Sequence, residues 1–450
     1  MGYVEIQRWV DTYSNRGRHP SMKKFEQIKE KTKKQFQTFS SLEIEELKDI
    51  LGLTIKKDEV NKLITFLCLL SAYTESSQFN ISFNAPSSTG KSYIPVEIAK
   101  LFPKEDLIKL AYASPMSFYH SQGVFDKEKK GIVVDLSRKI LIFLDMPHNQ
   151  LLERLRSLLS HDEKELKSQI TDKNQKYGQR TKNVFIKGFP AVIFCSAGLK
   201  LDEQEGTRFL LLSPETNQDK IKAAVMARAK KEADSTAYDA WLNNDERRIT
   251  LKERIEAIKA QQINDIKIPD VKSSVIDRFL KQRKYLKPRH SRDIGRIISF
   301  VKTFTLFNLW DRERDKNDII AKQEDIDNAF DIWDSISESQ EFNLPPYVFQ
   351  LFEECIKPAY EEKNKELISG GLTRREIIDK HFEIYGSYLP DWKLRREILP
   401  MLDTAGIIFQ EPDQEDKRKM LIYPTVLSPV SSDNSEEQEG KNRENYRGDE

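Results

Sequence analysis

The chain has 450 residues, 38% of them hydrophobic and 32% charged, which is typical of a folded polar protein with about two to four domains. Its 73 Lys and Arg residues balance 72 Asp and Glu residues, so net charge favours no class of partner. No run approaches the roughly 18 apolar residues of a membrane span, and the first residues lack the apolar core of a secretory signal. We therefore expect a cytoplasmic protein without a membrane partner. Cys68, Cys195 and Cys355 form no closely spaced pair, which predicts reduced structural thiols.

The order of predicted elements divides the chain. Residues 15–34 hold eight Lys or Arg and two Glu, a basic segment whose simplest interpretation is a solvated helix face. From about residue 80 to 215, apolar strand-like runs alternate with helical stretches, which predicts an α/β domain with a largely parallel sheet. Beyond Glu215 helices replace strands, and a smaller unit begins near Gly371. The tail from Ser428 has almost no apolar residues, which is typical of disorder.

The strongest motif is a phosphate-binding loop between a predicted strand, 79–84, and a predicted helix, 93–102. It comprises Ala85, Pro86, Ser87, Ser88, Thr89, Gly90, Lys91 and Ser92. Backbone N–H groups in such a loop surround a β-phosphate, Lys91 adds positive charge, and Ser92 offers a hydroxyl to Mg²⁺. Ala85 stands where the pattern usually has Gly, and a methyl group is small enough for the turn. The motif predicts that ATP and Mg²⁺ bind here.

An acidic residue at the end of a neighbouring buried strand should complete the magnesium site. The run KILIFLD ends in Asp145, which follows Lys91 by 54 residues, a spacing that suits a P-loop domain. Asp145 and Ser92 are therefore the predicted metal ligands.

These elements resemble the AAA+ ATPases. After Asp145 come a predicted helix, 151–160, an apparent β-hairpin, 165–188, and a strand, 191–197. A hairpin before that strand resembles the clade with pre-sensor-1 insertions, which includes minichromosome-maintenance-like and superfamily-three helicases. The resemblance implies a hexameric ring of identical subunits whose hairpins grip DNA in the pore. Four cations on or beside the hairpin turn match that role, although a solvated turn remains the alternative: Lys173, Lys176, Arg180 and Lys182.

The resemblance also implies further catalytic residues. Ser196 matches the polar sensor 1 residue, and Arg208, in Thr207-Arg208-Phe209, matches the arginine finger that reaches the γ-phosphate of the neighbouring subunit. The segment 287–308 resembles the sensor 2 helix of the lid. There Arg292 matches the arginine that faces the nucleotide, and Arg289 or Arg296 could take its place.

One position departs from the family pattern. AAA+ ATPases usually have a Glu after the acidic residue of the metal site, where this chain has Met146. The base that activates water must then come from elsewhere, with Glu153, His148 and Asp162 as candidates, or hydrolysis is slow and the protein acts as a switch. A metal pair of His148 and His161 is disfavoured, because they are 13 residues apart with no third ligand close by in sequence.

The C-terminal unit resembles a winged-helix domain. Thr373 and Glu376 form a predicted capping box, a second helix, 391–406, follows, and two strands flank a charged turn at 413–418. Such domains bind DNA or dock proteins. The cations that would contact phosphates are Lys393, Arg395 and Arg396 on the second helix and Lys417, Arg418 and Lys419 in the wing that the strands and turn form.

Together these patterns predict an α/β fold, with an AAA+ P-loop ATPase core, a helical lid and a C-terminal winged-helix domain. The predicted segments are a basic helical segment at 1–58, the ATPase core at 59–215, lid and linker helices at 216–370, the winged helix at 371–427 and a disordered tail at 428–450. The predicted function is an ATP-dependent helicase or translocase on single-stranded or forked DNA, of the kind found in phages, plasmids or mobile elements. The alternative is a nucleotide-dependent switch or remodeller that acts on a protein or a replication origin without unwinding. A small-molecule kinase would share the P-loop but would need neither an arginine finger nor a winged helix.

Overall fold

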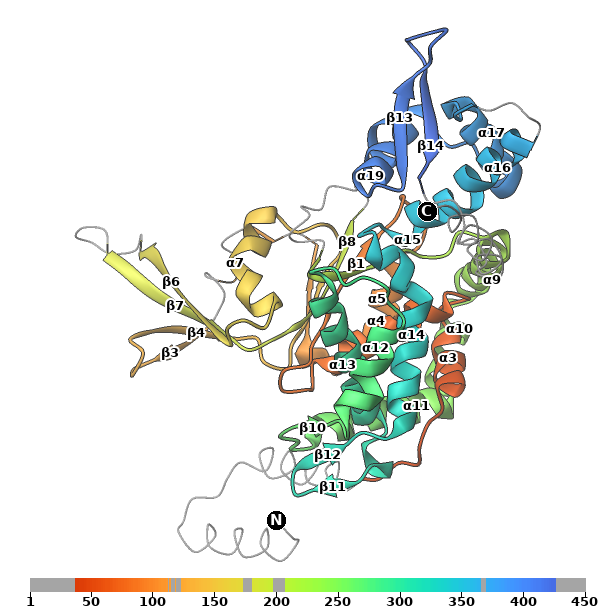
Figure 1. The fold of residues 1–450 in the computed structure, drawn as a ribbon. Helices are drawn as coiled ribbons and strands as arrows, with labels where there is room; N and C mark the ends of the chain where they lie inside the picture. The colour runs from red at the N-terminus through yellow and green to blue at the C-terminus, as the bar shows by residue number, and fades with distance from the viewer. Residues whose placement is uncertain are drawn as a thin grey trace, which may run out of the picture. The chain divides into compact units, whose positions relative to one another are not determined.

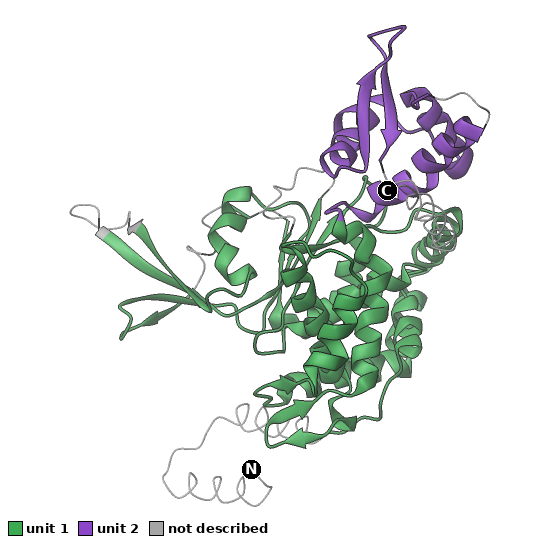
Figure 2. Cartoon of the chain, viewed as in Figure 1, with its two compact units in different colours: residues 1–341 green, residues 342–450 purple. Residues whose placement is uncertain are grey.

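The computed structural model describes residues 37–111, 113–114, 118, 123–172, 180–196, 207–365 and 370–425. The chain forms two compact units, residues 1–341 and 342–450 (Figure 2). The sequence placed the start of the smaller unit near residue 371. The structure starts it earlier because α16 (Lys357–Lys365) packs against α17 (Arg374–Tyr385) and β14 (Met420–Pro424).

A parallel sheet of five strands forms the centre of the first unit (Figure 1). Its strand order is β2-β5-β8-β1-β9. The strands are β1 (Asn80–Asn84), β2 (Leu107–Leu110), β5 (Ile140–Phe143), β8 (Ala191–Ser196) and β9 (Phe209–Leu212). All but β2 are buried along their whole length, which is why their sequences are continuous apolar runs. The predicted α/β fold with a parallel sheet is confirmed.

Two hydrophobic cores cover the two faces of this sheet. Residues of β5 alternate between them, with Ile140 and Ile142 in one core and Leu141 and Phe143 in the other. The first core is filled by α4 (Glu59–Ser71), α5 (Tyr93–Ala99), α13 (His290–Phe307) and α14 (Gln323–Glu341). The second is filled by α7 (Asn149–Leu159) and a second sheet. The three cysteines are free and buried, as the sequence predicted.

The second sheet has four strands in the order β3-β4-β7-β6. The predicted hairpin is β6 (Glu165–Asp172) and β7 (Arg180–Lys187), paired antiparallel along their full length. The sequence did not predict its neighbour, a hairpin of β3 (Val124–Asp126) and β4 (Gly131–Asp135). Because β4 pairs in parallel with β7, it belongs to this sheet and not to the central one (Figure 1).

Helices dominate the first unit after β9. They include α9 (Gln218–Ala233), α10 (Ser235–Asn243), α11 (Glu246–Ala260) and α12 (Asp277–Lys281). Contrary to the purely helical expectation, β10 (Ile266–Lys267), β11 (Arg314–Asp315) and β12 (Asp318–Ile320) form a small sheet. At the other end of the unit, α3 (Ile44–Gly52) packs in the first core, although the sequence grouped these residues with the basic N-terminal segment.

The second unit begins with α15 (Pro346–Leu351), a π-helical turn at Phe352–Ile356, and α16. The predicted helices follow as α17 and as the continuous run α18 (Asp391–Lys393), Leu394–Ile398 and α19 (Leu399–Thr404). The predicted strands are β13 (Ile408–Pro412) and β14, and Leu372 bridges to Ile422 of β14. The capping box of Thr373 and Glu376 is confirmed. None of the helices in the described ranges is both long and apolar enough to cross a membrane.

Candidate nucleotide site

The predicted phosphate loop follows the carboxyl end of β1. The Ala85 N–H donates to the Ser196 carbonyl at 3.3 Å, which joins the start of the loop to the end of β8. Ser88 and Gly90 have φ of 67° and 91°, and the Thr89 hydroxyl donates to the Pro86 carbonyl at 2.9 Å. Glycine adopts such a backbone most easily, so Gly90 allows the loop to turn sharply into α5. The loop is therefore a compact turn at a helix start, the geometry that binds phosphate.

Lys91 and Ser92, the last two residues of this loop, lie close to the segment that carries Asp145. The Lys91 Nζ lies 3.4 Å from the Pro86 carbonyl, so its ammonium group lies against the loop. The Ser92 hydroxyl lies 3.5 Å from the carbonyl of Leu144, the residue before Asp145. Asp145 is exposed, and its Oδ1 accepts the N–H of Met146 at 2.8 Å. A hydroxyl and a carboxylate on these two segments match the donor set that Mg²⁺ prefers.

Ser196 lies between the two halves of the site because β8 lies between β1 and β5. Its hydroxyl is 3.8 Å from the Met146 sulfur. The preceding residue, Cys195, donates its thiol to the Lys91 carbonyl at 3.4 Å, and burial raises the pKa of Cys195 to about 11. This thiol is therefore neutral near pH 7 and supports the loop instead of acting as a nucleophile.

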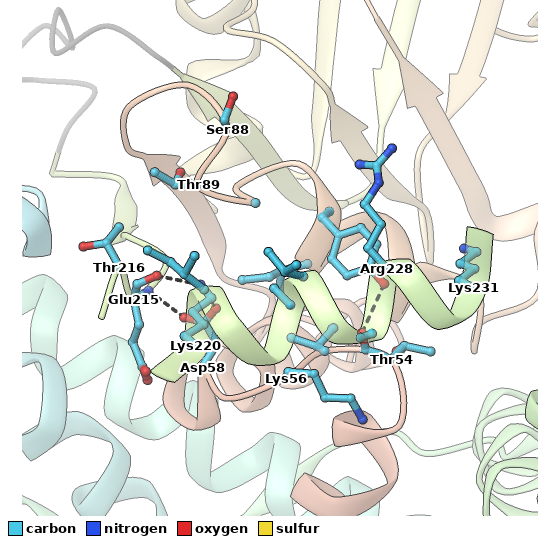
Figure 3. Close-up of a pocket in the computed structure, with 18 of the residues that line it drawn as sticks. Thr54, Lys56, Asp58, Ser88, Thr89, Glu215, Thr216, Lys220, Arg228 and Lys231 are labelled. Carbon is cyan, nitrogen blue, oxygen red and sulfur yellow. Dashed lines mark hydrogen bonds and ion pairs between the residues drawn. The ribbon is translucent and has the colours of Figure 1, made fainter. Parts of the chain in front are cut away.

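A cavity of about 570 Å³ adjoins Ser87, Ser88, Thr89 and Gly90 (Figure 3). Its other walls come from residues 54–58, α5 and the apolar side chains of α9. This volume lies within the range of small-molecule sites. Sequence reasoning missed these walls, because no motif marks α9 or residues 54–58.

A buried ion pair closes one end of this cavity (Figure 3). Asp58 is fully buried and pairs with Lys220 of α9. The Oδ1 of Asp58 also accepts the N–H of Glu215 at 2.8 Å and the side-chain amide of Asn61 at 2.9 Å. These bonds fix the start of α9 against the loop before α4.

The phosphate loop lies at the edge of the sheet formed by the carboxyl ends of the strands, and Arg208 lies at the edge formed by their amino ends. In the parallel register Phe209 pairs with Asn80, the first residue of β1. Arg208 therefore precedes the amino end of β9, about 16 Å along the strand from the loop. Its Nε donates to the Ser160 hydroxyl at 2.7 Å, beyond the end of α7.

Arg292 lies at that same edge. Its Nη1 donates to the hydroxyl of Thr207, the residue before Arg208. Arg292 therefore lies away from the phosphate loop of its own chain, and the prediction that it faces a nucleotide stays a prediction. The structure brings Arg292 and Arg208 together and separates both from Lys91.

Arg289 and Arg296, the alternatives to Arg292, also bind away from the phosphate loop. Both pair with the buried Asp293, and the Nη2 of Arg296 donates to the carbonyls of Thr207 and Phe209 at 2.8 and 3.0 Å. Burial lowers the pKa of Arg296 to about 10. Arg296 and Asp293 therefore position the segment that carries Arg208.

The position of α7 separates the three candidates for the catalytic base. Asp162 lies beyond the far end of α7, about 16 Å along its axis from the Asp145 end. His148 caps the near end, where its Nδ1 accepts the N–H of Gln150 at 3.2 Å. In neutral imidazole the other nitrogen then carries the proton and cannot accept one. Glu153 is exposed on the second turn of α7.

His148 and His161 lie at opposite ends of α7 and cannot share a metal. His161 packs edge-on against Phe189, with ring centroids 4.6 Å apart. Burial lowers the pKa of His161 to about 4, so this side chain is neutral at pH 7. Its role is structural.

The proposed DNA-contacting cations lie in the hairpin and in the second unit. Lys173 and Lys176 fall outside the described residues. Arg180 and Lys182 lie on β7, opposite Asp172 and Ile170 at the turn end of the hairpin.

In the second unit, Lys393 lies over the ring of Tyr347 at 5.6 Å, and Arg395 and Arg396 are exposed. Beside the charged turn, the Nε of Arg418 pairs with Asp416 at 3.0 Å. No protein-family model matches the sequence, and a search of curated protein sequences found no match.

Proposed function

We propose that this protein is an ATP-dependent DNA helicase or translocase of the AAA+ type that works as a ring of identical subunits. One observation carries the proposal. The phosphate loop, Asp145 and Ser196 occupy one edge of a parallel sheet, while Arg208 occupies the other. A nucleotide bound by one chain can then meet Arg208 only from a second chain.

The residues of the phosphate loop suit a nucleoside triphosphate. The loop N–H groups and Lys91 would hold the phosphates, Ser92 and Asp145 would hold Mg²⁺, and Ser196 would contact the γ-phosphate or the attacking water. When bound, Mg²⁺ offsets charge on the β- and γ-phosphates. The base would occupy the cavity lined by α9. Arg208 of the neighbouring subunit would stabilise the charge that develops on the transferred phosphoryl group.

The DNA substrate is inferred from the positions of cations along the chain. Arg180 and Lys182 lie towards the turn of a hairpin in the second sheet, and Arg395 and Arg396 lie on the second helix of the C-terminal unit. The order of helices and strands in that unit supports a winged helix. We propose a hexamer, by resemblance to the helicase clade.

The rival function is a nucleotide-dependent switch or remodeller. Met146 favours it, because a thioether cannot take a proton from water. Such a protein would bind ATP, hydrolyse it slowly and ignore DNA.

The test is the steady-state ATPase rate of the wild type and Lys91→Ala, with and without single-stranded DNA, at two salt concentrations. The motor predicts stimulation by DNA that is lost in the variant and weakens as salt rises, because phosphate contacts release counterions. ATP binding with little hydrolysis and no response to DNA would favour the switch.

A second measurement tests the hairpin. Arg180→Ala with Lys182→Ala should abolish unwinding while basal ATPase remains. Lys187→Ala is the matched control, since Lys187 lies at the other end of β7 and pairs with Asp135. Loss of ATPase and assembly together would show that the two hairpin cations are structural.

A further inference from the structure

Three aromatic side chains within eleven residues of the C-terminal unit are exposed. Phe382 on α17 is 48% exposed, Tyr388 in the following loop 70%, and Trp392 at the start of the second helix 56%. The rings of Phe382 and Tyr388 touch, with centroids 5.2 Å apart. Exposed aromatic side chains gathered in this way are typical of a binding surface.

The loop that carries Tyr388 is held in place. Gly386 ends α17 with φ of 65°, and the His381 Nδ1 lies 2.8 Å from the Ser387 carbonyl. Leu389 is buried, and Asp391 is bound by the Nε of Arg374 at 2.8 Å. The aromatic residues are thus presented by an anchored loop, so binding would cost little ordering entropy.

Positive charge adjoins these rings. Arg395 and Arg396 follow Trp392 by three and four residues in the same helical run, of which Leu394–Ile398 is π-helical, so both lie within about one turn of Trp392. Within the described ranges neither arginine has an ion-pair partner. Of the nearby acids, Asp391 pairs with Arg374 and Glu383 with Lys380, while Glu397 directly follows Arg396. The surface therefore combines flat aromatic rings with two exposed cations.

We propose that Tyr388 and Trp392 stack on unpaired bases of single-stranded DNA, while Arg395 and Arg396 bind its phosphates. Phe382 supports the Tyr388 ring. Cations alone would suffice for duplex DNA, whose base faces are already stacked and closed to side chains. Exposed rings beside cations are the combination that binds a single strand without sequence preference. The inference rests on the proposed function only in taking DNA as the substrate, because this surface lies in a different unit from the nucleotide site.

The test is equilibrium binding of the full chain, without ATP, to two labelled probes of equal length. One is oligothymidine and the other is its abasic counterpart, which keeps the phosphates and lacks the bases. The wild type should bind oligothymidine more tightly. Tyr388→Ala and Trp392→Ala should each weaken that binding about tenfold and leave abasic binding unchanged. Arg395→Ala should weaken both probes equally.

Three further variants control for folding and for aromatic loss elsewhere. Trp392→Phe and Tyr388→Phe keep a ring and should restore most of the affinity. Trp241→Ala removes an exposed tryptophan of the first unit and should bind both probes like the wild type. Equal wild-type affinity for the two probes would overturn the proposal, whether or not DNA stimulates the ATPase. The proposal would also be overturned if the alanine variants keep the wild-type preference for oligothymidine. A change in their oligomeric state would then show that the surface is a contact between copies of the chain.

Discussion

A mixture of two inactive variants tests whether Arg208 acts on the nucleotide of a neighbouring chain. Lys91→Ala removes the loop ammonium group, and Arg208→Ala removes the guanidinium at the other edge of the sheet. An arginine side chain reaches about 7 Å, whereas the two edges lie about 16 Å apart along β1. Within one chain Arg208 therefore cannot contact phosphates held by Lys91, and each homogeneous variant should lose about 10³-fold or more of its ATPase rate.

The mixture should regain activity by an amount that follows from counting interfaces. A site works when its own chain supplies Lys91 and the neighbour supplies Arg208. In an equal, randomly assembled mixture each condition holds for half the chains, so about a quarter of the sites are complete, whatever the ring size. If each site hydrolyses ATP independently, we expect about 25% of the wild-type ATPase rate per subunit, measured at steady state with saturating ATP.

Two controls make a negative result informative. Differently tagged variants must co-purify, which shows that they share rings, and Ser160→Ala should keep much of the activity, since it removes only one partner of Arg208. If mixed rings form and the ATPase stays at the level of the separate variants, Arg208 does not act in trans and the ring model fails at this residue.

Three other perturbations have defined outcomes. Glu153→Gln should lower kcat by about 10²-fold or more, while His148→Asn, which keeps an acceptor at the start of α7, should stay near the wild-type rate; the reverse pattern would make His148 the base. Asp325→Ala should lower the free energy of unfolding by about 3 to 5 kcal/mol, because Asp325 binds the buried Arg312 through both oxygens, at 2.8 and 2.6 Å. Urea unfolding measures that loss, and Asp315→Ala, which removes an exposed pair with Lys267, should unfold like the wild type. Folding lowers the pKa of His161 to about 4, whereas in the unfolded chain it is about 6.5. As the pH falls from about 6.5 to 4, the unfolded chain therefore binds a proton that the folded chain does not. The free energy of unfolding should decrease over that range, by less than about 3 kcal/mol. His161→Asn should remove most of this pH dependence, because asparagine readily adopts the left-handed backbone found at position 161 (φ 58°) but does not titrate. Urea unfolding at several pH values measures it. If the pH dependence is unchanged in the variant, other groups cause it.

The phosphate loop could be predicted from sequence because its chemistry is local. Eight consecutive residues contain the turn, the cation and the hydroxyl, and the strand before and the helix after are visible as apolar runs. Asp145 could be predicted because a buried parallel strand ends two residues before it. The β6–β7 hairpin could be predicted from two strand-like runs on either side of the polar turn 174–179.

The remaining parts of the site depend on contacts between distant residues. The cavity is formed by residues 54–58 and α9, more than 150 residues apart, and only tertiary packing brings them together. The β3–β4 hairpin was missed because β3 has only three residues, too few to show a period of two. The position of Arg292 beside Thr207 could not be predicted, because a helix pattern gives the face of a residue but not the edge of the sheet that the helix end approaches.

The direction of the strands decides what this site can do alone. In a parallel sheet all carboxyl ends share one edge, so the loop after β1, Asp145 after β5 and Ser196 at the end of β8 must meet. By the same rule a residue that precedes β9 must lie at the other edge. Arg296 and Asp293 form a buried ion pair, and Arg296 donates to the carbonyls of Thr207 and Phe209 on both sides of Arg208. Such support is what a side chain positioned for a function requires, and it holds the half-buried Arg208 at the edge where the proposed neighbouring chain would bind.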